Sequence, residues 1–138
     1  MKGLEINKRT FWYCNYVSSE NVRDSLGRFT GEKVLQYSTA VQMKANISPA
    51  TGNSNAEQFG SLDDYDKVIV FTGESPIDEH SVLFVDKDPE YTTVTTYEDV
   101  DGTWTARTIQ VPVYDYTVRR VAQSINSVSI AISKVNVR

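Results

Sequence analysis

The side chains best suited to chemistry in this sequence of 138 residues gather around a single histidine. His80 lies between Asp78 and Ser81, and serine, histidine and aspartate are the residue types of a hydrolytic relay. The fold assembles such a relay from distant segments, and the sequence contains no nucleophile-elbow motif. We therefore expect His80 to be a surface or turn residue, and we expect the protein not to be an enzyme.

A short acidic run lies upstream of this histidine. Asp63, Asp64 and Asp66 offer the hard oxygen ligands that Ca²⁺ prefers. The spacing of a calcium-binding loop is absent, however, and so are a phosphate-binding loop and a dinucleotide-binding motif. Paired carboxylates also serve in glycoside hydrolysis, but only within a cleft that a sequence does not reveal. We expect a solvated acidic turn here, and no metal or cofactor in the protein.

Cys14 is the only cysteine of the chain, which excludes an intramolecular disulfide and a thiolate metal cluster. It stands among aromatic residues in the run Phe11-Trp12-Tyr13-Cys14-Asn15-Tyr16. A free cysteine in such surroundings behaves as a small apolar side chain. We expect Cys14 to be buried and to serve packing.

Charge and hydropathy exclude two further classes. The net charge is −4. Beyond the N-terminal segment, Arg119-Arg120 is the only pair of adjacent basic residues. Proteins that grip nucleic acid by its phosphates present a basic patch, so we expect no tight binding of DNA. We also expect neither a signal peptide nor a membrane span, because no apolar run is long enough.

The elements that must position these residues are mainly strands. Residues 35–47 alternate between apolar and polar side chains and predict a half-buried strand, and residues 67–71 form a short β-branched run that predicts another. Residues 48–66 between them are polar and rich in Ser, Asn, Gly and Asp. A connection of this length is either functional or an unconstrained surface segment. Within it, residues 54–60 could form one helical turn.

Upstream and downstream segments extend the β pattern. Residues 9–17 are rich in aromatics and predict a first strand, whereas the polar residues 18–30 predict a loop. Ser75-Pro76 is typical of the start of a short helical turn. Residues 81–86 predict a strand that Asp86-Lys87-Asp88-Pro89 ends.

A β-hairpin is predicted from residues 91–97 and 103–111, which are rich in Thr, Tyr and Val. Asp101-Gly102 between the two arms is a strong signal for a tight hairpin turn. The arms carry few large aliphatic residues, so we expect the hairpin to project from the body. Its exposed candidates for a protein contact are Tyr97, Asp101, Gly102 and Trp104.

The C-terminal part alternates again over residues 114–119 and 128–133, which predicts two strands, although residues 117–125 are also compatible with a short helix. Several short strands at such spacing are typical of a sandwich or small barrel. The sequence therefore predicts one mainly β domain spanning residues 1–138. Its fold would be a small β-barrel or sandwich with long loops and a projecting β-hairpin.

An ordered set of short motifs covers most of residues 34–137. Its members are Ile47-Ser48-Pro49, Phe59-Gly60, Tyr65-Asp66-Lys67, Pro76-Ile77-Asp78-Glu79, Tyr114-Asp115-Tyr116, the run 121–127 and Lys134-Val135. The set resembles the head-closure proteins, also called stoppers or head–tail connector proteins, of long-tailed bacteriophages (siphophages). The 91–111 hairpin is not part of the short pattern of that family, which makes it an insertion.

The resemblance implies a structural protein of the virion neck, made in the host bacterial cytoplasm. It would form a homo-oligomeric ring, a dodecamer or hexamer, between the portal–adaptor complex and the tail proteins. The ring would close the channel after packaging and offer a docking surface to the tail, while genomic DNA passes through it without sequence-specific binding. No membrane is involved.

The resemblance also assigns a channel loop, or gate, to residues 48–64. A polar loop rich in Gly and Asn can rearrange, and copies around a ring axis can pair through backbone hydrogen bonds. The residues assigned to it are Ser48, Pro49, Thr51, Gly52, Asn53, Asn55, Gln58, Phe59, Gly60, Asp63 and Asp64.

Two alternatives stay open at this point. The first is another component of the same neck, a tail terminator or tail-completion protein, which the neighbour that it binds would distinguish. The second is a small β-barrel hydrolase or carbohydrate-binding module. The missing catalytic constellation disfavours the enzyme, and a glycan screen would address the module.

Overall fold

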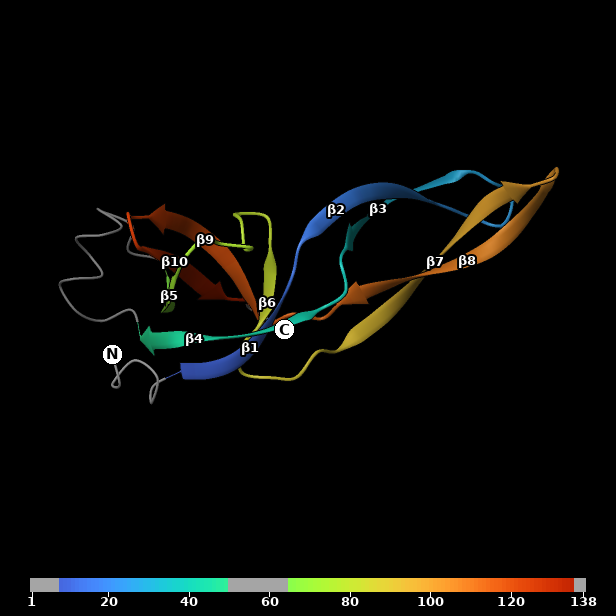
Figure 1. The fold of residues 1–138 in the computed structure, drawn as a ribbon. Coiled ribbons are helices and arrows are strands. Elements are labelled where there is room, and N and C mark those ends of the chain that lie inside the picture. The colour runs from blue at the N-terminus through green and yellow to red at the C-terminus, as the bar shows by residue number, and fades with distance from the viewer. Residues whose placement is uncertain (1–7, 50–64, 136–138) are drawn as a thin grey trace.

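Ten β-strands and no helix make up the described part of the chain, which is residues 8–49 and 65–135 of a computed structural model (Figure 1). The prediction of a mainly β fold is confirmed. The strands are β1 (Lys8–Cys14), β2 (Tyr16–Arg23), β3 (Phe29–Tyr37), β4 (Val41–Pro49), β5 (Lys67–Thr72), β6 (Val82–Phe84), β7 (Tyr91–Val100), β8 (Thr103–Pro112), β9 (Tyr116–Gln123) and β10 (Ser127–Lys134).

Six of these strands close into a small antiparallel barrel in the order β1-β4-β5-β10-β9-β6. Side chains alternate along each strand, so every second residue points into the barrel. Ile69 and Ile130 lie opposite each other on β5 and β10 and are fully buried, as is Phe11 on β1. Ile77 adds a buried side chain from the connection between β5 and β6. The β-branched and aromatic composition of these strands therefore supplies a continuous core.

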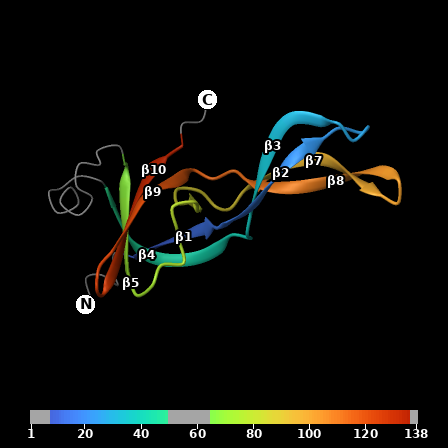
Figure 2. The ribbon, with the colours of Figure 1, turned by 90° about the horizontal axis from the view of Figure 1, so that it is seen from above.

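The other four strands form a projection that we call the arm, residues 16–37 and 91–112 (Figures 1 and 2). It consists of two hairpins, β2–β3 and β7–β8, which are separate two-stranded sheets. Val22 and Val34 of the first hairpin pack with Ile109 of the second in a small core of their own. The prediction of a projecting hairpin over residues 91–111 is confirmed, and its partner is the β2–β3 hairpin.

Two predictions of chain course are wrong. Residues 18–30 are not a loop but contain β2 and the tight turn that leads into β3. Residues 35–47 are not one strand, because the chain leaves the arm after Tyr37 and enters the barrel at Val41. The polar/apolar alternation continues through the extended link at Ser38, so the sequence pattern shows no break there.

The helical expectations also fail within the described residues. Residues 117–125 form β9 and the turn after it rather than a helix. Ser75 starts a turn in which its Oγ accepts a hydrogen bond from the Ile77 amide at 3.0 Å, and no helix follows. The strand expected over residues 81–86 is limited to β6. The helical turn expected over residues 54–60 lies outside the described residues.

The arm joins the barrel at a junction that we call the wrist. Asn15 and Ser38 bond each other twice there: the Asn15 amide donates to Ser38 Oγ at 2.9 Å, and the Ser38 amide donates to Asn15 O at 2.8 Å. The buried Ser81 donates its hydroxyl hydrogen to Asn15 Oδ1. Because these bonds tie β1, β3 and the β5–β6 connection together, the arm leaves the barrel in a defined direction.

Candidate functional site

The first candidate is the channel loop expected over residues 48–64. The structure describes Ser48 and Pro49, both exposed at the end of β4. The remaining residues of the expected gate lie outside the described residues, namely Thr51, Gly52, Asn53, Asn55, Gln58, Phe59, Gly60, Asp63 and Asp64.

The two ends of this connection are held together on the barrel. Pro49 at the end of β4 pairs with Lys67 at the start of β5. Asp66 is fixed to β10, because its amide donates to Ile132 O at 2.8 Å and its carboxylate accepts from the Lys134 amide at 2.6 Å. Asp66 is thus a structural anchor at the root of the connection. The connection leaves and re-enters the barrel at one place.

The second candidate is the end of the β7–β8 hairpin. Asp101 and Gly102 have positive φ angles of 51° and 84°, as the tight turn predicted from their residue types requires. Asp99 closes the turn through its Oδ1, which accepts from the Gly102 amide at 2.8 Å. Trp104 on β8 is 38% exposed. The structure therefore brings Asp101, Gly102 and Trp104 together at this end, with Tyr97 further along β7 and partly buried.

Trp104 packs against the turn of the other hairpin. The Arg23 guanidinium lies 4.0 Å from the ring centroid of Phe29 and 5.6 Å from that of Trp104. Gly27, with φ at 81°, lies directly against the indole, and a Cβ there would meet it at 2.2 Å. We call this region, residues 23–29 and 98–104, the arm tip. Sequence reasoning did not identify its β2–β3 half, because Arg23, Gly27 and Phe29 fall within the segment expected to be a loop.

Polar bonds join the two hairpins behind the tip. Arg107 on β8 forms an ion pair with Glu20 on β2 and a longer one, 3.7 Å, with Glu98 on β7. The hydrogen bond that Arg107 donates to Glu20 is the main cause that raises the pKa of the Arg107 guanidinium above its usual range. Thr96 on β7 is fully buried, and its Oγ1 accepts from the Arg23 amide at 2.8 Å. The arm is therefore one unit rather than two independent hairpins.

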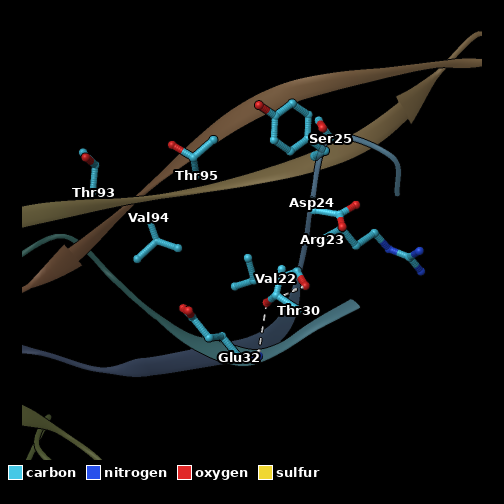
Figure 3. Close-up of a pocket in the computed structure, with 10 residues that line it drawn as sticks. Val22, Arg23, Asp24, Ser25, Thr30, Glu32, Thr93, Val94 and Thr95 are labelled. Atoms are coloured by element: carbon cyan, nitrogen blue, oxygen red, sulfur yellow. Dashed lines mark hydrogen bonds between the residues drawn. The ribbon is translucent and has the colours of Figure 1, made fainter. Parts of the chain in front are cut away.

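The hollows on the arm do not converge on a reacting group. One open hollow has a volume of about 690 Å³. Figure 3 shows that Val94 reaches from its lining toward the β2–β3 hairpin, while Thr93 and Thr95 point away from that hairpin. Thr30 Oγ1 is already used there, donating to Val22 O at 3.2 Å. In a neighbouring hollow, Arg23 already lies over one face of each exposed aromatic ring. These hollows suit contact with another surface better than capture of a small molecule.

The charged residues of the barrel strands have a single sign, which their scattered positions in the sequence do not reveal. Within the bounds of the six barrel strands every charged residue is basic, although the residues are scattered along the chain: Lys8, Arg9, Lys44, Lys67, Arg119, Arg120 and Lys134. Arg119 is the extra residue at a β-bulge, where Ala131 pairs with Arg120 and Ile132 pairs with Val118. Both arginines are exposed. A bulge can re-aim a side chain in this way, so two consecutive residues of β9 face solvent.

The remaining candidates from the sequence take ordinary positions. His80 is an exposed turn residue whose amide donates to Asp78 Oδ1 at 2.8 Å, and its ring lies beside Tyr16. The expectation of a turn histidine is confirmed. Cys14 is fully buried beside Val82 and Phe84, as expected, and burial raises the pKa of its thiol. Ser81 Oγ serves the wrist instead of a relay with His80.

Across residues 8–49 and 65–135, no three His, Cys, Asp or Glu side chains gather as ligands for a metal ion. Within the same ranges, no helix is long and apolar enough to cross a membrane. Comparisons with models of protein families, with curated proteins and with solved structures return no match.

Proposed function

We propose that this protein is a structural component of a bacteriophage neck, a head-closure protein that forms a ring between the portal–adaptor complex and the tail. The ordered motifs described above resemble that family along most of the chain. The proposal assigns the closure of the DNA channel to residues 48–64 and the docking of the tail to an outer surface of the ring. It gives the protein no catalytic step and no cofactor.

The single observation that carries the proposal is the way in which the barrel holds the roots of that segment. Pro49 and Lys67 pair on adjacent strands, and Asp66 is bonded to β10. A segment attached in this manner can change its conformation while both anchoring strands keep their core contacts. Gating requires two loop states that differ by only a few kcal/mol, and a barrel whose core lies elsewhere tolerates both.

A replacement of the loop tests this assignment. Exchanging residues 51–58 for a short Gly/Ser link costs little stability, because each doubling of loop length changes the closure entropy by about 0.6 kcal/mol. We expect the thermal midpoint of the variant to stay close to that of the parent. In a background without tails, where the stopper alone retains the genome, we expect the fraction of DNA-filled heads to collapse.

The matched control replaces residues 124–126, the exposed turn between β9 and β10, by the same kind of link. This variant should retain DNA. Normal retention by the 51–58 variant, with its ring still assembled, would remove the gate from the proposal and leave a docking collar.

A tail terminator or tail-completion protein differs in the neighbour that it binds. A head-closure protein should bind the portal–adaptor complex before the tail, whereas a terminator should bind the tail-tube protein directly. Pull-down of the purified protein with each of these assemblies separates the two. Binding to the tail tube alone would contradict head closure.

A further inference from the structure

We propose that the arm tip of one copy docks on the outer wall of β9 in a second copy, and that this head-to-tail contact links neighbouring subunits. The inference rests on the proposed ring, because it names the partner surface with which the ring is built. The wall spans three adjacent strands, and its accessible residues are Arg119, Arg120 and Ala122 of β9 and Val70 of β5. Ser129 and Ala131 of β10 and Val68 of β5 lie between them and are buried.

The arm tip is acidic where it is most exposed. The stretch from Glu98 to Gly102 carries three carboxylates and no basic residue, and of these only Glu98 has an ion-pair partner, Arg107 at 3.7 Å. Asp101 forms no ion pair in the part of the chain that the structure describes, and Asp99 bonds the backbone of its own turn. By contrast, Asp24 in the other hairpin is neutralised by Arg28 at 3.1 Å. The free negative charge therefore lies on the β7–β8 turn.

The same tip exposes apolar side chains beside these carboxylates. Leu26 is 65% exposed, Phe29 61% and Val100 46%. Exposed apolar groups rimmed by charge are typical of a surface that contacts another protein. A partner surface should accordingly offer basic groups next to apolar ones.

The β9 wall offers this combination. Arg120 is exposed and makes no ion pair with another described residue, and Arg119 stands beside it because of the bulge. Ser129 pairs with Ala122 on one side and with Val70 on the other, so these three form a row next to the row that contains Arg120. Ala122 and Val70 are partly exposed. Positive charge and small apolar groups thus lie side by side, complementary to the tip.

The geometry requires two copies for this contact. Figures 1 and 2 both place the far end of the arm well away from the barrel. The bonds at the wrist, between Asn15, Ser38 and Ser81, hold the arm in that direction. A tip that cannot fold back meets the wall of a different copy. Because tip and wall are different patches of one chain, the contact is heterologous, and heterologous contacts are those that generate rings.

Intermolecular paramagnetic relaxation enhancement detects such a contact even when it is weak. A nitroxide on Thr103→Cys would sit at the tip, while the buried Cys14 stays unlabelled. This spin-labelled protein is mixed at millimolar concentration and low salt with ¹⁵N-labelled parent. We expect line broadening at the amides of residues 119–122 and 129–131, and a loss of that broadening at high salt because exposed charges are then screened. A nitroxide on Glu74→Cys, on an exposed turn outside the arm, is the control for random collisions.

Charge reversal then tests the pairing of the two patches. One variant carries Asp99→Asn, Asp101→Asn, Thr103→Lys and Thr105→Lys on the tip, and the other carries Arg119→Glu and Arg120→Glu on the wall. Each variant alone has like charges on both patches, so we expect no shift of the wall amides with concentration. Mixing the two restores complementarity in both directions, and the shifts of residues 119–122 should return.

Broadening that is absent from the wall, confined to the arm, or equal for the control nitroxide overturns the proposed contact. So does a mixture of the two variants that behaves like each variant alone. The DNA-filled-head assay separates this failure from that of the ring itself. If particles that carry the wall variant retain DNA, the proposed contact is wrong and head closure is unaffected. If the contact is detected but DNA retention is normal after loop replacement, head closure alone is wrong.

Discussion

Asp86, which follows β6, links two barrel strands through its carboxylate: β9 at Tyr116 and β1 at Arg9. Its carboxylate accepts a hydrogen bond from Tyr116 Oη at 2.8 Å and a longer one from Arg9 at 3.4 Å. Burial acts to raise the pKa of Asp86, but these two hydrogen bonds and the nearby positive charge of Lys67 outweigh it and hold that pKa below its ordinary value. The ionised carboxylate is therefore stabilised by folding.

Replacing Tyr116 with Phe should weaken this arrangement in a pH-dependent way. The loss of one hydrogen bond to a charged, partly exposed group should cost about 1 kcal/mol at pH 7. A carboxyl whose pKa is lowered by folding contributes stability above its unfolded pKa, about 4, and loses it as the pH falls through the folded value. The difference in unfolding free energy between parent and variant should therefore decrease below about pH 4. Urea denaturation at pH 7 and at pH 3 measures this difference.

The matched control is Tyr97→Phe, because the Tyr97 hydroxyl makes no hydrogen bond to any residue that the structure describes. The unfolding free energy of that variant should equal that of the parent at both pH values. A Tyr116→Phe gap that is equally large at both pH values would contradict the role assigned to Asp86.

A comparison of two glycines in the arm distinguishes the stability cost of backbone strain from that of a side-chain clash. Gly27 and Gly31 both have positive φ angles, 81° and 92°, so alanine at either position carries about 1 kcal/mol of backbone cost. Only Gly27 lies against the Trp104 indole, whereas nothing approaches the Cβ position of Gly31 within 4 Å. Gly27→Ala should therefore cost about 1–3 kcal/mol more than Gly31→Ala.

Urea denaturation measures this difference, and the Nε1–H resonance of Trp104 reports its cause. That resonance should shift in Gly27→Ala and stay in place in Gly31→Ala. Equal stability losses and an unmoved indole in both variants would show that Trp104 does not pack on the turn as described.

At the scale of elements, the sequence predicts structure that depends on neighbouring residues, such as a tight turn. It does not predict structure that depends on packing between distant segments. Asp101-Gly102 predicted the β7–β8 turn because both residues tolerate positive φ. β2 was missed because its sequence, YVSSENVR, buries only Val22 and is otherwise suited to solvent. A strand in a thin arm has little core to face, so it lacks the hydrophobic alternation from which strands are predicted.

The candidate surfaces show the same limit. The expected tip residues Asp101, Gly102 and Trp104 are neighbours in the sequence, and a hairpin keeps such neighbours together. The basic wall instead draws on Arg120 and on small residues of β5 and β10, which only the barrel closure brings side by side. Ala122 and Ser129 face each other across the short β9–β10 turn, but no sequence rule places Val70 beside them without knowledge of the strand order.

Thr96 on β7 links the two hairpins through its hydroxyl, which accepts a hydrogen bond from the Arg23 amide on β2. Thr96→Val keeps the shape of the side chain but leaves the Arg23 amide without its acceptor, which should cost about 1–3 kcal/mol. Thr96→Ser keeps the acceptor and loses only a methyl group, about 1 kcal/mol. Hydrogen exchange at the Arg23 amide should accelerate in the valine variant and much less in the serine variant. Equal exchange in the two variants would show that the hydroxyl does not bridge the hairpins.

At the scale of the whole molecule, the described residues form a main barrel core and a separate arm core, with two smaller clusters around Cys14 and around Val68. The barrel core includes Ile69 and Ile130, and the arm core is built around Val22, Val34 and Ile109. The arm core is small and surrounded by exposed strand residues, whereas several barrel residues are fully buried. Regions with few buried apolar contacts open at a lower free energy than the global unfolding free energy. The arm should thus open without the barrel, which leaves it free to adjust to a partner surface.

Native-state hydrogen exchange of two core variants tests this division. Val34→Ala removes part of the arm core at a cost of about 2 kcal/mol, and Ile130→Ala creates a cavity in the barrel at about 2–5 kcal/mol. If the arm opens by itself, Val34→Ala should speed exchange at the paired amides of β2 and β3 and leave those of β5 and β10 at the parent rate. Ile130→Ala should speed exchange at β5 and β10, and at any arm amide that exchanges only through global unfolding. Equal acceleration of barrel amides by Val34→Ala would mean that arm and barrel unfold as one cooperative unit, in which case the arm is a rigid extension of the barrel and can dock only without rearrangement.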